Sequence, residues 1–206
     1  MLNASFFDKD ASDVAKALLG KVLSHNVGGV WRRVRIIETE AYYIHEKGSH
    51  ASLGYTENRR ALFMPAGTIY MYYARGGDSF NVSCHGEGNA VLLKSGVATE
   101  DNPPDVLSAM AEANPVMNRK TGESRPRPFD RLCSGQTLLC KSMGLKVTEW
   151  RGKTFDAASI YIDDIGYTPE NIAVAPRLGI PKGRDEHLPL RFIDTAFIKS
   201  TTNGRI

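Results

Sequence analysis

One uninterrupted segment, residues 34–43 (VRIIETEAYY), constrains the fold of this chain more than any other stretch. β-Branched and aromatic residues dominate it, and neither glycine nor proline breaks it, which predicts a β-strand. Because side chains alternate between the two faces of a strand, every second residue should share one face; here these are Ile36, Glu38, Glu40 and Tyr42. Neighbours on one face lie about 7 Å apart, so an acid and an aromatic ring can line one pocket.

Two further predicted strands carry matching chemistry. A Tyr-rich strand places Tyr70 and Tyr72 on a common face, and another strand does the same for Leu92 and Lys94. An acid, several aromatic rings and a cation are the groups that a site for a flat heteroaromatic ligand needs. The more common role of such residues is structural, because tyrosines in strands usually pack in a core and a strand glutamate usually lies in solvent or in an ion pair.

The rest of the chain indicates short elements in a single domain. Of its 206 residues, 42% are hydrophobic and 24% are charged, as in an ordinary globular domain. Capping residues and terminal glycines predict helices at 12–20, 102–114 and 134–144. We therefore expect residues 1–206 to form one α+β domain with a curved, mostly antiparallel β-sheet and short peripheral helices, and residues 201–206 to be a frayed tail.

The composition also bears on the compartment. We find no apolar run of membrane-spanning length and no basic, then apolar, leader at the N-terminus, so we expect no membrane partner. Three cysteines leave an odd thiol and form no CxxC pair, which favours a reducing compartment. We expect a cytoplasmic monomer, associated with the nucleoid if the chain is bacterial.

Positive charge is concentrated in one loop. The net charge of the chain is +3, and residues 118–131 alone carry an excess of the same size. Basic loops are often merely solvated, but several basic clusters on one chain favour a polyanionic partner. The predicted helix at 134–144 would also offer free backbone N–H groups to a phosphate. The residues that we expect to bind phosphate groups are Arg119, Lys120, Arg125, Arg127, Ser134 and Gly135.

Taken in order, these motifs resemble the alkyladenine (3-methyladenine) DNA glycosylase family of base-excision repair enzymes. The resemblance runs from about residue 14 to residue 192, and its sharpest parts are 37–42 (IETEAY), 63–72, Asn81 and 132–135 (LCSG). It implies an enzyme that flips a damaged purine out of double-stranded DNA and hydrolyses its N-glycosidic bond, with no metal and no cofactor.

The resemblance also implies a role for individual residues. Glu40 would activate the attacking water, with Lys94 beside it where the family has an arginine. Arg75 would stand at the hairpin tip where family members place an aromatic wedge, and it could fill the gap left by the flipped base. As an amine, Lys94 could also form a Schiff base, but a charge partner for Glu40 or for a phosphate is the more common role of a lysine.

The base pocket follows from the same resemblance. Tyr42 and His50 would sandwich the flipped base, and Tyr72 would close the pocket edge-on. Asn81 would lie at the pocket floor, where its amide can reject the exocyclic amino group of guanine, with Leu92 also contacting the base. Stacking between rings favours cationic, alkylated purines through cation–π attraction.

Three other functions remain open at this point. Glu38 and Glu40 on one face could be the two acids of a carbohydrate-cleaving glycosidase. The chain could also be a DNA-binding relative of the family without catalysis or with altered specificity. A metal hydrolase is disfavoured, because the histidines and cysteines show no metal-ligand spacing.

Overall fold

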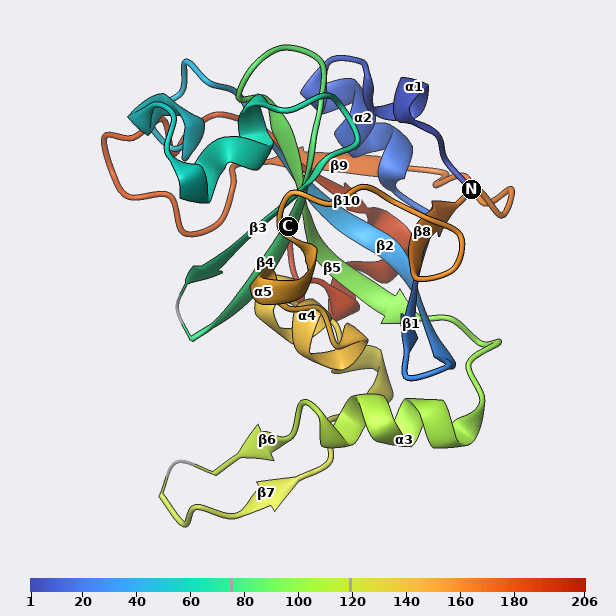
Figure 1. The fold of residues 1–206 in the computed structure, drawn as a ribbon. Helices are drawn as coiled ribbons and strands as arrows, with labels where there is room; N and C mark the ends of the chain where they lie inside the picture. The colour runs from blue at the N-terminus through green and yellow to red at the C-terminus, as the bar shows by residue number, and fades with distance from the viewer. Residues whose placement is uncertain (75, 119) are drawn as a thin grey trace.

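The strand predicted at residues 34–43 lies at the centre of the molecule. In a computed structural model that describes residues 1–74, 76–118 and 120–206, it forms strand β2 (Val30–Tyr42) of an eight-stranded sheet (Figure 1). One edge of β2 pairs first with β1 (Val22–Val27) and then with β10 (Arg191–Asp194), and the other edge pairs with β5 (Ala90–Ala98). Each of these pairs is antiparallel.

The remaining strands extend this sheet on both sides. Its order is β3-β4-β5-β2-β1-β8, and β9 pairs with β10. The bounds of these strands are Ile69–Ala74 for β3, Gly77–Ser83 for β4, Ile160–Asp163 for β8 and Ile172–Ala175 for β9. A separate hairpin, β6 (Val116–Met117) with β7 (Ser124–Arg125), projects away from the body (Figure 1). The prediction of an α+β fold with a mostly antiparallel sheet is confirmed.

Short helices surround the sheet, as the sequence predicts. They are α1 (Ala4–Phe7), α2 (Ala11–Leu18), α3 (Pro104–Glu112), α4 (Gln136–Met143) and α5 (Val147–Trp150), with 3-10 turns at Ala51–Leu53, Glu57–Phe63, Phe129–Arg131 and Thr195–Ser200. The Asp10 side chain caps α2, and Gly144 ends α4 with a left-handed φ of 70°. No helix in the described part of the chain is long and apolar enough to cross a membrane.

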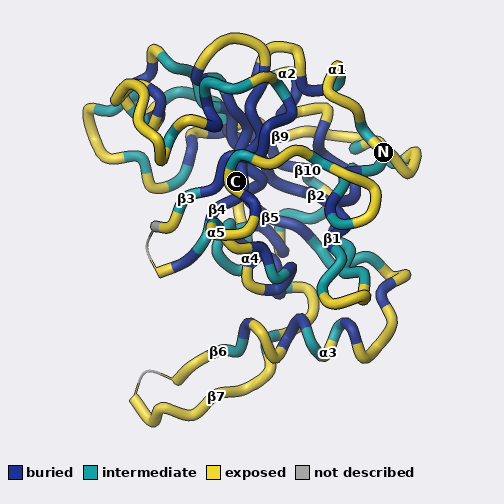
Figure 2. Tube along the Cα trace, viewed as in Figure 1, coloured by how far each residue is buried: buried dark blue, intermediate teal, exposed yellow. Residues whose placement is uncertain are grey.

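Strands β2 to β5 present alternate residues to two different environments. On one face, Thr39 Oγ1 donates a hydrogen bond to Ala15 O in α2, and apolar residues of all four strands join the main core. The other face carries Glu40, Tyr72 and Lys94, which make polar contacts described below. Buried residues follow the strands through the centre of the molecule, and the projecting hairpin is mostly exposed (Figure 2). The face that carries Glu40 is therefore the more polar and aromatic of the two.

The ladder between β2 and β5 is irregular at one point. Between Ile36 and Thr39 the pairing skips Ile37, but the register is the same on both sides, with Ile36 opposite Gly96 and Glu40 opposite Leu92. Ile36 packs in the main core, and Glu40 is fully buried.

The end of the chain is packed more firmly than predicted. Thr201 is fully buried. The backbone N–H and the Oγ1 hydroxyl of Thr202 donate to Glu38 Oε2 over 3.0 and 2.9 Å. A buried carboxylate needs such donors, so the expected frayed tail is in fact anchored at its first two residues.

Candidate active site

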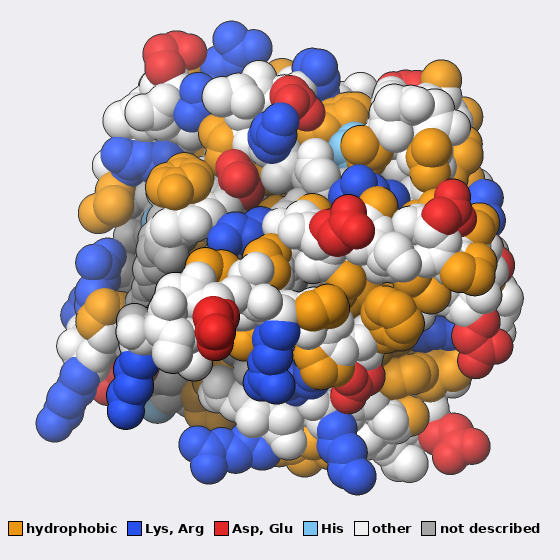
Figure 3. Space-filling model, turned by 90° about the horizontal axis from the view of Figure 1, so that it is seen from below, with side chains coloured by type: hydrophobic (Ala, Val, Ile, Leu, Met, Phe, Trp, Pro, Cys, Tyr) orange, Lys and Arg blue, Asp and Glu red, His pale blue; other side chains and the backbone are white. Residues whose placement is uncertain are grey.

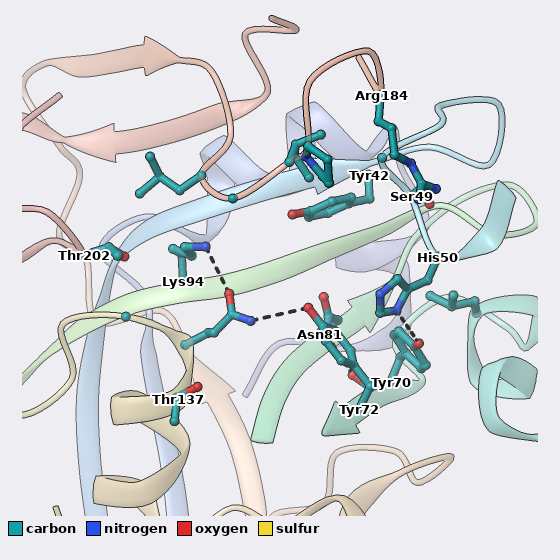
Figure 4. Close-up of a pocket in the computed structure, with 18 of the residues that line it drawn as sticks. Tyr42, Ser49, His50, Tyr70, Tyr72, Asn81, Lys94, Thr137, Arg184 and Thr202 are labelled. Atoms are coloured by element: carbon teal, nitrogen blue, oxygen red, sulfur yellow. Dashed lines mark hydrogen bonds between the residues drawn. The ribbon is translucent and has the colours of Figure 1, made fainter. Parts of the chain in front are cut away.

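A cavity of about 540 Å³ opens on the polar face of strands β2 to β5 (Figure 4). This volume lies within the range usual for small-molecule sites. Of the residues predicted from the sequence, seven line it: Tyr42, His50, Tyr72, Asn81, Lys94, Ser134 and Gly135. They come from all four strands, from the loop after β2 and from the segment that leads into α4. The sheet thus brings together residues separated by up to ninety-three positions in the chain.

Aromatic rings form the walls of this cavity. The His50 ring meets the Tyr72 ring at a centroid distance of 4.4 Å, and the two planes are inclined at 65°. His50 Nδ1 lies 2.9 Å from the hydroxyl of Tyr70. Tyr42 faces this group from β2 across the cavity (Figure 4). Loss of solvation lowers the pKa of His50, and the nearby charges of Arg59 and Arg184 lower it further, so the ring is mainly neutral near pH 7.

Glu40 lies directly behind the cavity wall and is fully buried. Its Oε2 accepts a 2.7 Å hydrogen bond from the hydroxyl of Tyr42. Its Oε1 accepts one from the backbone N–H of Leu178 over 3.0 Å and lies 3.3 Å from Lys94 Nζ. Burial, followed by the negative charge of Glu40, raises the pKa of Tyr42 well above its ordinary value. Tyr42 therefore stays protonated and donates to the carboxylate.

Glu38 does not share this cavity. Its carboxylate pairs with Arg191 over 3.0 Å and accepts hydrogen bonds from Ser95 and Thr202. Neither Glu38 nor Glu40 is among the residues that line the cavity. They differ in their partners, because Glu40 bonds to Tyr42 and Lys94 of the cavity wall, whereas Glu38 forms a buried ion pair with Arg191. This ion pair favours a structural role for Glu38 over that of a second acid in a glycosidase.

Two other predicted base contacts differ in position. Asn81 lines the cavity, and its Nδ2 donates to the backbone oxygen of Tyr70 over 3.1 Å, which fixes the orientation of the amide. Leu92 pairs across the sheet with both Glu40 and Asn81, but it is buried and does not line the cavity. Leu92 thus supports the floor from below.

The predicted phosphate-binding residues fall into two groups. Lys120 and Arg125 are exposed on the projecting hairpin, whereas Arg127 donates to the backbone oxygen of Asn114 and is held at its base. Seen from below, Lys and Arg side chains are spread over this face, several of them at its left and lower margins, with acidic side chains among them (Figure 3). Arg119 and the predicted wedge Arg75 lie outside the described residues.

Ser134 and Gly135 form part of the cavity wall. The Ser134 hydroxyl donates to Ser200 O over 2.6 Å, and the Gly135 N–H donates to Ser95 Oγ over 3.0 Å. Because both donors are engaged within the protein, neither group points at the outer surface. The expected anion site at the start of α4 thus has its first two donors already occupied.

Sequence reasoning missed several residues of the site, and two of them directly contact the predicted ones. Gln136, the first residue of α4, accepts a 3.0 Å hydrogen bond from Lys94 Nζ. Arg177 lies with its guanidinium carbon 4.5 Å from the centroid of the Tyr42 ring, and its NH1 donates to Ala41 O. Gln136 directly follows the motif at 132–135, and this position in the sequence could have identified it as a site residue. Arg177 had none, because it lies 135 positions from Tyr42 in the chain.

The side chains of the described residues offer no group of three or more metal-binding His, Cys, Asp or Glu. What the fold and the pocket do define is a hydrolase-type site, in which a ring-walled cavity for a flat ligand stands over a buried carboxylate with a lysine beside it.

Comparison with known proteins identifies the family. The model of the methylpurine-DNA glycosylase (MPG) family matches residues 5–196. "Putative 3-methyladenine DNA glycosylase" of Pseudomonas aeruginosa (strain UCBPP-PA14) is 58% identical over 202 residues, which cover 97% of this chain and 82% of that protein. "DNA-3-methyladenine glycosylase" of Mus musculus is 34% identical over 205 residues, 93% of this chain and 58% of that protein. The chain belongs to the methylpurine-DNA glycosylase family. The predicted enzyme class, a DNA glycosylase of DNA repair, is thereby confirmed.

Proposed function

We propose that this enzyme flips an alkylated or deaminated purine out of double-stranded DNA and hydrolyses its N-glycosidic bond with a water molecule activated by Glu40. The observation that carries this proposal is the position of Glu40, which is buried behind the rings of the cavity and bonded to Tyr42 and Lys94. Because Tyr42 and Lys94 line the cavity, the carboxylate lies next to the space that a flipped base would enter.

The rings supply the preference for damaged bases. A purine between Tyr42 and His50 would stack on two aromatic faces, which is worth about 1–3 kcal/mol per base. A cationic, N-alkylated purine gains a further cation–π attraction. The lowered pKa of His50 fits this role, because a neutral imidazole does not repel a cationic base. Damaged bases that pair poorly also cost less to flip.

The chemical step needs one base and little else. A carboxylate oxygen can accept two hydrogen bonds, so Oε2 can accept one from water as well as the one from Tyr42. Glu40 would take a proton from that water as its oxygen bonds to C1′. The electrons of the broken C1′–N bond leave with the base. A cationic base departs neutral, whereas a neutral base departs as an anion and takes its proton from solvent. The carboxylate also balances the positive charge that develops on the sugar.

Lys94 fits a charge-partner role better than a nucleophilic one. Its ammonium lies 3.3 Å from Glu40 Oε1 and donates to Gln136, so two contacts hold it in place. A lysine nucleophile must instead be neutral. We therefore propose a monofunctional glycosylase that acts as a monomer and forms no covalent adduct with DNA.

A lesion panel tests this function. The enzyme is incubated with duplexes that carry one 3-methyladenine, hypoxanthine or ethenoadenine, beside undamaged DNA and chromogenic glycosides. We expect abasic sites at one or more lesions, no cleavage of sugars and no adduct after borohydride treatment. Tight binding of the damaged duplexes without any abasic product would instead indicate a non-catalytic DNA-binding protein.

A further inference from the structure

The start of α4 reaches into the cavity through one side chain. Gln136 Oε1 accepts from Lys94 Nζ over 3.0 Å, and Gln136 Nε2 donates to Ser79 Oγ over 2.7 Å. A longer contact of 3.4 Å runs from Nε2 to the hydroxyl of Tyr72. A single amide thereby connects residues of β3, β4 and β5.

The chemistry of the partners fixes the orientation of this amide. An ammonium group has three donors and no acceptor, so only the amide oxygen can meet Lys94. The nitrogen must then face Ser79, whose hydroxyl can accept, and Ser79 is fully buried. A flipped amide would place two donors against each other. Gln136 is therefore an oriented acceptor with a fixed anchor on its far side.

We propose that Gln136 is a positioning residue for hydrolysis. Its amide oxygen accepts a hydrogen bond from the Lys94 ammonium and thereby keeps that group next to Glu40. Lysine is a point charge on a flexible stem with rotatable donors, whereas an arginine would be oriented by its planar fork. A lysine at this place therefore needs an external restraint. Gln136 supplies this restraint and is in turn held by Ser79.

This inference rests on the proposed function for its kinetic consequence but not for the contact itself. The contact is tested by the 1H–15N signal of the Lys94 ammonium, which is observable when hydrogen bonds slow its exchange. We expect a resolved signal in the wild type and its loss or shift in Gln136→Met. Lys141→Met, on the exposed side of α4, is the control and should leave it unchanged. An unchanged Lys94 signal in Gln136→Met would overturn the proposal.

The kinetic test separates positioning from binding. Gln136→Met keeps the size of the side chain but removes its acceptor, so the single-turnover rate at saturating enzyme should fall about 10–100-fold. The dissociation constant for lesion-bearing duplex should change by less than about threefold, since the amide oxygen and nitrogen are both bonded within the protein. Ser79→Ala should give a smaller fall in rate, because it loosens Gln136 without touching Lys94. A loss of affinity with an unchanged rate would overturn the proposal.

A double-mutant cycle asks whether Gln136 acts through Lys94. If it does, Gln136→Met should lower the single-turnover rate of the wild type but cause no further decrease in a Lys94→Met background. Equal effects in both backgrounds would mean that Gln136 acts independently, and the proposal would be wrong. If Lys94→Met does not fold, the ammonium signal and the Ser79→Ala rate still decide the matter. A wild type without activity on any lesion would refute the proposed function and leave the ammonium test standing.

Discussion

The two buried glutamates of β2 should fail in opposite ways, and Glu38→Gln is the variant that shows this. Glu38 holds Arg191 at 3.0 Å and accepts from the N–H and hydroxyl of Thr202 at the end of the chain. An amide keeps one acceptor oxygen but loses the charge, so the buried guanidinium of Arg191 is left without its counter-ion.

The size of the effect follows from the loss of that ion pair. Breaking a buried ion pair by removing one partner costs about 3–5 kcal/mol. Against a total stability of about 5–15 kcal/mol for a domain, this is a large fraction. For a chain of this length, each kcal/mol lowers the melting temperature by about 2–4 °C. The melting temperature of Glu38→Gln should therefore fall by about 6–20 °C.

The assay combines unfolding with activity. Urea unfolding gives the free energy of unfolding for the wild type, for Glu38→Gln and for the exposed control Glu87→Gln. Single-turnover excision is measured at a temperature where all three remain folded. We expect Glu38→Gln to be unstable yet active within about tenfold, because Glu38 pairs with Arg191 and bonds to neither Tyr42 nor Lys94. A loss of less than about 1 kcal/mol, or a folded Glu38→Gln that is inactive, would refute this division between the two acids.

Three further predictions concern the site and its surroundings. Tyr42→Phe keeps the stacking ring but removes a 2.7 Å hydrogen bond to Glu40, so urea unfolding should show a loss of about 1.5–3 kcal/mol; an unchanged stability would contradict the bond. The His50 ring should titrate in NMR with a midpoint below 6.5, and a midpoint above 6.5 would contradict its burial. Because the pKa of His50 is lowered in the folded state, its contribution to stability is full above pH 6.5 and is lost as the pH falls through the folded pKa. The double variant Lys120→Ala/Arg125→Ala should weaken binding of all duplexes and leave the saturating single-turnover rate unchanged. The slope of log affinity against log salt concentration should become shallower by about 0.9 for each phosphate that these side chains neutralise. An unchanged slope would mean that the hairpin does not contact DNA.

Much of the fold was predictable because its signals are local. The run at 34–43 predicted the central strand, and alternation placed Tyr70 with Tyr72 and Glu40 with Tyr42. Helix α4 ends at Gly144, as predicted, because glycine readily adopts the left-handed conformation required there. The irregular pairing of β2 with β5 near Ile37 had no such local signal, because it depends on the partner strand as much as on β2 itself.

What could not be predicted depends on distant contacts. Arg191 meets Glu38 across 153 positions of sequence, and the end of the chain is anchored by the same carboxylate. Arg177 stacks on Tyr42, and Gln136 meets Lys94, only once the sheet has closed. No local pattern carries these pairings. The site was therefore predictable for residues that share a strand face, and not for those that orient them from other elements.

The central claim is that Glu40 activates the water behind a ring-walled pocket that receives the base. Its most direct test is chromatography of the free base released from a lesion-bearing duplex by the wild type and by Glu40→Gln, with the affinity of both for the same duplex measured in parallel. We predict stoichiometric release by the wild type, and for the variant unchanged affinity with a rate at least about a thousandfold lower. Release by a folded Glu40→Gln at the wild-type rate would contradict the account.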